Sequence, residues 1–224
     1  MKKGLTEMVF ILDRSGSMAG LESDTIGGFN GMLGSQRQVE GEAVVTTVLF
    51  DDQYELLHDR IPLAGVAPIT AKQYYVRGCT ALLDAVGRTI QKISNVQDNT
   101  AEEMRAEKVI FVITTDGMEN ASREYNYPRI HQMIREKQEK CGWEFIFLGA
   151  NMDAVSEGAK MGIRADRAAT YSCDSAGIHE NYKAVGNFVT HARSCAAPMG
   201  GEWKKNVEED QKRRKNGFGL KKNR

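Results

Sequence analysis

The sequence lacks the features that mark several large classes of protein. No apolar run approaches the roughly 18 residues of a membrane span, and the run after Lys2 and Lys3 is shorter than the apolar part of a secretory signal peptide. Neither G-x-x-x-x-G-K-S/T nor G-x-S-x-G occurs, so the usual nucleotide-binding loop and the nucleophile turn of serine hydrolases are missing. We therefore expect a cytoplasmic protein with no membrane partner.

Paired cysteines and a net charge are also missing. Four cysteines occur without close spacing, each in or beside an apolar segment: Cys79, Cys141, Cys173 and Cys195. This pattern predicts free, buried thiols in a reducing compartment rather than disulfide bonds. Thirty basic residues balance thirty acidic ones, so no global field favours nucleic acid. No acidic residue follows Asp210, and contact with nucleic acid is expected only through the basic tail beyond it.

The composition is that of one globular domain with a short tail. The chain has 224 residues, of which 41% are hydrophobic and 27% charged. We expect residues 1–197 to form the domain. From residue 198 to 224, glycine, lysine, arginine and asparagine dominate without apolar periodicity, which predicts a basic, flexible C-terminal tail.

Apolar strands alternate with amphipathic helices along the chain. The strands are expected at residues 4–12, 43–50, 108–115, 143–148 and 167–171, and residues 54–63 are expected to return as an antiparallel edge strand. Helices are expected from about 21 to 39, 81 to 96, 130 to 140 and 175 to 194. This order predicts an α/β fold with a doubly wound, mostly parallel six-stranded sheet and helices on both faces.

Oxygen-bearing side chains follow these strands. The apolar run ending at Leu12 gives way to Asp13, Ser15 and Ser17, and the strand ending at Thr115 is followed by Asp116. Open α/β sheets bind ligands beyond the carboxyl ends of their strands, so these side chains are expected at the working edge. Carboxylates and hydroxyls are hard ligands that suit Mg²⁺ or Mn²⁺.

Thr80, which directly precedes the helix expected from residue 81, adds a third hydroxyl. Together the five residues resemble the metal-ion-dependent adhesion site of von Willebrand factor type A domains: Asp13, Ser15, Ser17, Thr80 and Asp116. Residues 78–86 are similar to the threonine loop and following helix of that family, and residues 115–120 to its aspartate loop. The resemblance covers roughly residues 4–195 and is greatest to compact intracellular members from bacteria and phages. Cys79 departs from the family pattern, because a second glycine is usual there.

The resemblance implies a binding protein rather than an enzyme. The five residues would hold Mg²⁺ or Mn²⁺, with Ca²⁺ a weaker fit, and leave one coordination position open for a Glu or Asp of a protein partner. Such a module would serve as a subunit or adaptor of an intracellular complex. Six residues on neighbouring loops are candidates for the rim that contacts the partner: Asp51, Asp52, Glu119, Asn120, Asn151 and Asp153.

Other interpretations remain open for several of these residues. Asp51 and Asp52 also suit a simple turn, Asp153 suits a helix cap, and Asp84 suits a helix start that bonds to nearby loops. A metal-dependent phosphohydrolase or phosphotransferase is an alternative, although haloacid-dehalogenase-like enzymes carry a second Asp where Ser15 stands. A structural subunit whose metal only makes the loops rigid would use the same five residues.

Overall fold

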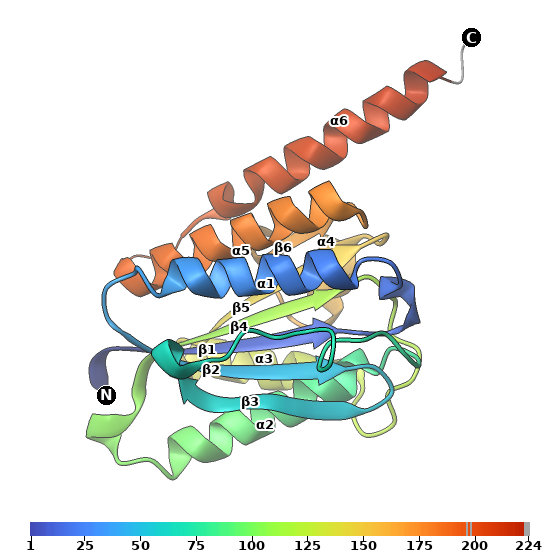
Figure 1. Ribbon diagram of the computed structural model, residues 1–224. Coiled ribbons are helices and arrows are strands. Elements are labelled where there is room, and N and C mark those ends of the chain that lie inside the picture. Colours follow the sequence, from blue (N-terminus) through green and yellow to red (C-terminus); the bar gives the residue numbers. More distant parts are fainter. Residues whose placement is uncertain (196, 198, 222–224) are drawn as a thin grey trace.

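Six strands form one mixed sheet at the centre of the protein (Figure 1). The computed structural model describes residues 1–195, 197 and 199–221, and only the backbone from 215 onward. The strands are β1 (Lys2–Asp13), β2 (Glu42–Phe50), β3 (Tyr54–Pro62), β4 (Ala106–Thr115), β5 (Glu144–Ala150) and β6 (Ala168–Tyr171). Their order is β3-β2-β1-β4-β5-β6, and only the β2–β3 pair is antiparallel. The predicted fold class, including the antiparallel edge strand, is confirmed.

Helices cover both faces of this sheet. On one face lie α1 (Glu22–Gln36), α5 (Ser175–Ser194) and α6 (Lys205–Lys221); on the other lie α2 (Leu82–Asp98), α3 (Tyr127–Cys141) and α4 (Ala154–Lys160). Short 3-10 turns span Gly16–Met18, Leu63–Gly65, Glu102–Met104, Ala165–Arg167 and Gly201–Lys204. Within the described residues, no helix combines the length and apolar character needed to cross a bilayer.

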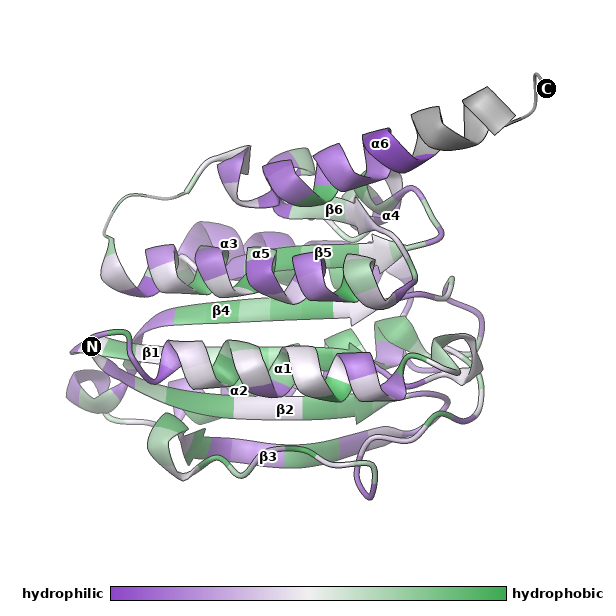
Figure 2. Cartoon of the chain, turned by 45° about the horizontal axis from the view of Figure 1, so that its top comes forward, coloured by the Kyte–Doolittle hydropathy of each residue, from purple (hydrophilic) through white to green (hydrophobic). Residues whose placement is uncertain are grey.

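The central strands are apolar along most of their length because helices bury them on both sides. Met8 to Leu12 in β1 and Phe145 to Leu148 in β5 are at most 1% exposed. Figure 2 shows this as hydrophobic colour along most of β4 and the visible middle of β5, while the coloured part of α6 is mainly hydrophilic. Two-sided burial of this kind is typical of parallel sheets, and it explains why the strands read as unbroken apolar runs rather than alternating patterns.

Local sequence fixes the ends of α3 (Tyr127–Cys141), which begins three residues before the expected start at residue 130. The Asn126 side chain accepts a hydrogen bond from the Arg129 backbone N–H, and Pro128 lies in the first turn. Gly142 ends the helix in the left-handed conformation with φ 65°, which costs a glycine little. α3 therefore begins and ends where its own capping residues require.

The segment predicted to be a tail is folded onto the domain over much of its length. Trp203 is 3% exposed and Val207 is 2% exposed, and both join the core cluster that contains the buried residues of α5. The Trp203 ring packs edge-on against Phe188 at 5.5 Å, and its Nε1–H donates to the Asp166 carbonyl at 2.9 Å. The predicted boundary at residue 197 is therefore corrected: Trp203 and Val207 pack into the core although they form no periodic pattern, and Lys204 Nζ donates to the carbonyls of Ala165 and Ala168 at 2.8 Å. Residues 198 and 222–224 of the predicted tail, and residue 196 just before it, lie outside the described residues.

The cysteine prediction is half wrong. All four cysteines are free, but Cys79, Cys141 and Cys195 are exposed and Cys173 is only partly buried. Each lies at an element end or in a loop, where adjacent apolar sequence does not ensure burial.

Replacing Trp203 by Ala tests whether the C-terminal segment contributes to the core. We expect the free energy of unfolding to fall by about 3–5 kcal/mol, because a large ring is removed from a packed site. Urea denaturation measures the change. Lys205→Ala is the matched control: its side chain is 74% exposed, so a change within about 0.5 kcal/mol is expected. Equal stability of the two variants would contradict the packing of this segment.

Candidate metal centre

The parallel pairing of β1 with β4 brings two carboxylates to one edge of the sheet. Leu12 pairs with Thr114, so Asp13 at the end of β1 and Asp116 just after β4 emerge side by side. From this point β1 leads to α1 on one face, whereas β4 leads to α3 on the other. Such a divergence opens a crevice between neighbouring strand ends, which is where open α/β sheets place their ligands.

Three hydroxyls converge beside these carboxylates. The position that a Cβ atom would occupy on Gly117 lies 2.7 Å from Thr80 Oγ1, 3.2 Å from Ser17 Oγ and 3.6 Å from Ser15 Oγ. Ser15 Oγ and Ser17 Oγ are 3.1 Å apart, and Ser17 donates to Asp116 Oδ1 at 2.5 Å. Ser15 and Thr80 are buried, whereas Ser17 is exposed, so the cluster is open to solvent on the Ser17 side. The three loops predicted to meet do meet.

Asp13 is held firmly at the floor of this cluster. Its Oδ1 accepts the Ser15 backbone N–H at 2.7 Å, and its Oδ2 accepts the Thr115 hydroxyl at 2.6 Å. The Tyr74 hydroxyl donates to the Asp13 carbonyl at 2.5 Å. Burial raises the pKa of Asp13 to about 6, against the opposing effect of the Thr115 and Ser15 hydrogen bonds. Burial also raises the pKa of Asp116 above its ordinary value.

Sequence reasoning missed Thr115 and Tyr74 as supports of the site. Thr115 directly precedes Asp116, so its place at the strand end was visible in the sequence. Tyr74 lies 61 positions from Asp13 in a loop without secondary structure, and no sequence pattern connects the two. Only the folded chain reveals that contact.

Asn120 fixes the Thr80 loop against the Asp116 loop. The Thr80 backbone N–H donates to Asn120 Oδ1 at 2.9 Å, and the Asn120 N–H donates to the Thr80 carbonyl at 3.0 Å. These two hydrogen bonds join the Thr80 loop to the Asp116 loop, much as backbone hydrogen bonds join neighbouring strands. Asn120 was expected on the partner-contacting rim. It is exposed, but its side-chain oxygen accepts the Thr80 N–H and so fixes the position of Thr80.

Two acidic residues tie the start of α2 to the loop that follows Asp116. Both Glu119 oxygens accept hydrogen bonds, Oε1 from the backbone of Ala121 and Ser122 and Oε2 from the Leu83 N–H. Asp84 in turn accepts three backbone N–H groups, each at 2.9 Å, from Arg123, Glu124 and Tyr125. Glu119 therefore holds the loop rather than facing outward, and the helix-start interpretation of Asp84 is confirmed.

The other rim candidates differ in their exposure to solvent. Asp51 is fully buried and pairs with Arg14 and Arg77, which corrects its assignment to the rim. Burial alone would raise the pKa of Asp51, but hydrogen bonds from Arg77, the Gln53 backbone and Arg14 hold it below its ordinary value. Asp52 and Asn151 are exposed at this edge.

Asp153 has the capping role that was its alternative interpretation. Its side chain accepts the Ser156 N–H at 3.1 Å and so caps α4. The residue is exposed, but its position is dictated by the start of the helix.

The donor set suits a hard divalent cation. The cluster offers three neutral hydroxyls and two carboxylates, and all five donors are oxygen. Within the described part of the chain, no group of three or more His, Cys, Asp or Glu side chains could hold a metal. Cys173 Sγ lies 3.5 Å from Asp116 Oδ2, and burial together with that carboxylate raises the pKa of the thiol to about 11. A protonated thiol is a poor competitor for the ion.

Solved structures with this architecture have little sequence in common with the chain. No model of a protein family matches the sequence, and neither does any curated protein. The von Willebrand factor type A protein from Catenulispora acidiphila is 14% identical with a TM-score of 0.56, over 83% of this chain and 42% of that one. The chain has the von Willebrand factor type A fold.

Two further structures with this fold contain metals. One is proximal thread matrix protein 1 from the mussel byssus with a zinc-occupied MIDAS motif: 15% identity, TM-score 0.57, 84% of this chain and 46% of that one. The other is manganese-loaded TRAP from Plasmodium vivax: 15% identity, TM-score 0.53, 81% of this chain and 74% of that one. This chain thus spans less than half the length of the mussel protein. At such identities the likeness establishes the type A fold alone.

Asp84→Ala tests the hydrogen bonds that position the loop after Asp116 in this type A fold. Three backbone N–H groups lose their acceptor, so we expect a loss of roughly 1–3 kcal/mol in the free energy of unfolding. Hydrogen exchange at residues 123–125 should accelerate. Asp59→Ala is the control, since Asp59 is a half-exposed partner of Lys92. Unchanged exchange at residues 123–125 would show that Asp84 does not hold the loop.

Proposed function

We propose that this protein is a divalent-metal-dependent binding module that recognises an acidic group of a protein partner. The observation that carries the proposal is the convergence of the Ser15, Ser17 and Thr80 hydroxyls around one point beside Asp13 and Asp116. The ion is proposed to be Mg²⁺ or Mn²⁺, with Ca²⁺ less well suited because it prefers more ligands. The zinc- and manganese-containing type A structures support a divalent cation in general.

Each residue has a distinct part in this proposal. The hydroxyls of Ser15, Ser17 and Thr80 contact the ion directly. The two oxygens of Asp13 already accept hydrogen bonds from Ser15 and Thr115, so Asp13 is suited to support the ion indirectly rather than to contact it. Asp116 would do the same through its hydrogen bond with Ser17. Because neutral hydroxyls cancel little of its charge, a bound Mg²⁺ would supply an electrophilic position for a Glu or Asp carboxylate on the solvent-facing side.

We favour binding over catalysis for a structural reason. In a haloacid-dehalogenase-like phosphohydrolase, the residue two positions after the first Asp is a carboxylic acid that donates a proton. Here that residue is Ser15, whose hydroxyl is buried and lies 3.1 Å from Ser17 Oγ. A serine hydroxyl is far too weak an acid to replace that carboxylic acid as a proton donor at neutral pH.

We also propose an intracellular location and a role as a subunit or adaptor of a complex. Three exposed free cysteines support this, since exposed thiols persist in reducing compartments. Nucleic acid contact through the basic tail stays a prediction. One of its arginines, Arg214, is paired with Asp210 and Asp174.

Titration with Mn²⁺ tests the metal site. We expect binding in the roughly micromolar to millimolar range, and Asp13→Ala or Thr80→Ala should abolish it because each removes a donor or its support. Isothermal titration calorimetry measures the affinity, and circular dichroism checks that the variants fold. Undiminished binding in both variants would end the assignment.

A second arm separates recognition from a purely structural metal. If the ion keeps a position open for a carboxylate, saturating acetate should tighten Mn²⁺ binding to the wild type, because binding of the two is reciprocally coupled. A structural ion enclosed by protein ligands would show no change. Sodium chloride at the same concentration controls for ionic strength.

Gly117→Ala removes no donor yet should block the ion. Its added methyl would lie 2.7 Å from Thr80 Oγ1 and 3.2 Å from Ser17 Oγ, within the space the hydroxyls surround. We expect Mn²⁺ affinity to fall by at least about tenfold, or about 1.4 kcal/mol. Gly31→Ala is the control, because nothing lies within 4 Å of its added methyl. Equal affinities in both variants would show that the hydroxyl cluster is not where the ion binds.

A further inference from the structure

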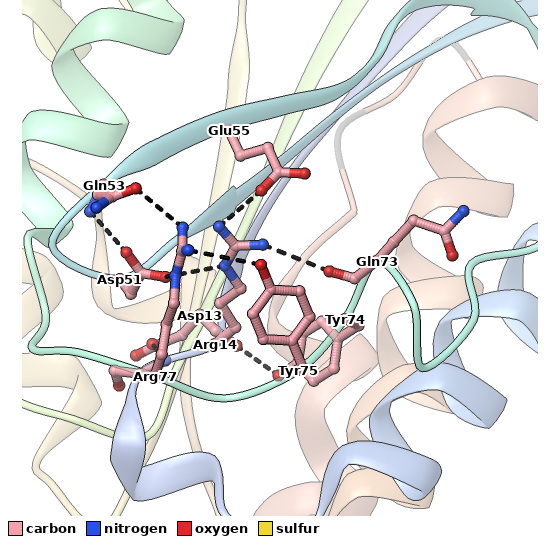
Figure 3. A network of polar contacts seen from close by, with 10 residues as sticks. Asp13, Arg14, Asp51, Gln53, Glu55, Gln73, Tyr74, Tyr75 and Arg77 are labelled. Carbon is pink, nitrogen blue, oxygen red and sulfur yellow. Dashed lines mark hydrogen bonds and ion pairs between the residues drawn. The ribbon is translucent and has the colours of Figure 1, made fainter.

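Arg14 is the largest fully buried side chain of the protein, and it lies between two of the proposed metal-site residues in the sequence. Its Nε donates to Asp51 Oδ2 at 3.0 Å, and its Nη2 lies 2.7 Å from Glu55 Oε2. Its Nη1 donates to the Gln73 carbonyl at 3.4 Å. Figure 3 shows the guanidinium at the centre of this network, turned away from Asp13.

The network joins loops that the sequence keeps far apart. The Arg14 guanidinium lies 5.3 Å from the centre of the Tyr75 ring, and the Arg77 guanidinium lies 5.6 Å from the same ring. Arg77 also donates to Asp51 Oδ2 at 2.6 Å. One buried carboxylate therefore serves two arginines, and the Tyr75 ring packs against both (Figure 3).

Backbone hydrogen bonds connect this network to the loops that carry the hydroxyl donors. The Arg14 N–H donates to the Phe50 carbonyl at 2.8 Å, and the Arg77 N–H donates to the Arg14 carbonyl at 2.9 Å. The Asp51 carbonyl accepts the N–H of Ala81, the residue after Thr80, at 2.8 Å. The loop with Ser15 and Ser17 and the loop with Thr80 are thus both fixed to the segment around Asp51.

We propose that Arg14 is a positioning residue of the metal site, which sets the distance between the Ser15–Ser17 loop and the Thr80 loop through Asp51. This inference rests on the proposed function. Hydroxyls are weak ligands, so the affinity of the site depends on having all three in place before the ion arrives. Arg14 does this at a distance and touches no donor atom.

The chemistry of the guanidinium suits this task better than that of an ammonium. Its planar fork reaches Asp51, Glu55 and the Gln73 carbonyl at once while it packs against the Tyr75 ring. A lysine at this position could carry the charge but could satisfy only part of that set. Arg14→Lys should therefore behave as an intermediate case, and Arg14→Met should lose the network.

The protein contains a matched control at the opposite end of the sheet. Arg193 is 9% exposed and also ties loops together, donating to the carbonyls of Gln36, Val39 and Gly41 at 2.6, 3.2 and 3.0 Å. These acceptors lie from the last residue of α1 to the residue before β2, far from the strand ends that carry the hydroxyls. Arg193→Met removes a buried arginine of the same kind without touching the site.

The experiment compares Mn²⁺ affinity and thermal stability of wild type, Arg14→Met, Arg14→Lys and Arg193→Met in the full chain. We expect both Met variants to melt at lower temperature. Mn²⁺ binding, read from the electron paramagnetic resonance signal of the free ion, should weaken about tenfold in Arg14→Met, less in Arg14→Lys, and by under about twofold in Arg193→Met. A purely structural role for Arg14 would instead lower the two affinities alike or leave both unchanged.

The outcomes separate this inference from the proposed function. No Mn²⁺ binding by wild type would overturn the proposed function, and the inference with it. Binding by wild type and equally by folded Arg14→Met would overturn the inference alone. If Arg14→Met does not fold, Asp51→Asn replaces it: this isosteric change removes the carboxylate charge shared by Arg14 and Arg77, so unchanged affinity there would also overturn the inference.

Discussion

The parallel pairing of β1 with β4 is the constraint on which the rest of the structure depends. It places Asp13 and Asp116 beside each other, although more than a hundred residues separate them, and it does so by ordinary strand register. Burying both strands on both faces makes that register hard to change, because a shift would expose apolar residues or break ladder hydrogen bonds. The relative positions of Asp13 and Asp116 in the candidate site are therefore set by the central strands of the sheet.

The hydroxyl donors, in contrast, come from loops, and loops need additional restraint. Here the restraint is polar: Asn120 holds Thr80, Glu119 and Asp84 hold the segment after Asp116, and Arg14 with Asp51 links the first loop to the Thr80 loop. Several acidic and amide residues near the site thus act on neighbouring backbone rather than on a ligand. Two of their partners, the backbone N–H groups of Thr80 and Leu83, belong to buried residues, where an unmade hydrogen bond costs more than at the surface.

Residue type alone does not explain which of the candidate rim residues are exposed and which are buried. Asp52 and Asn151 are exposed as expected, but Asp51, identical in chemistry and adjacent in sequence, is fully buried. The difference comes from Arg14 and Arg77, which neutralise Asp51 from positions that no local pattern relates to it. Likewise, Trp203 and Val207 look like isolated apolar residues of a tail in the sequence, and they are buried only because the folded chain packs them into the core that includes Phe188 of α5.

The sequence by itself determined the strand and helix order, the sheet type, the caps of α3 and the oxygen donors at the strand ends, because each of these follows from periodicity or from residues close along the chain. Tertiary structure alone decided that Arg14 turns inward, that Tyr74 supports Asp13 and that α6 packs on α5. Those contacts join residues tens of positions apart, and their free energy depends on burial and mutual geometry, which no local pattern records.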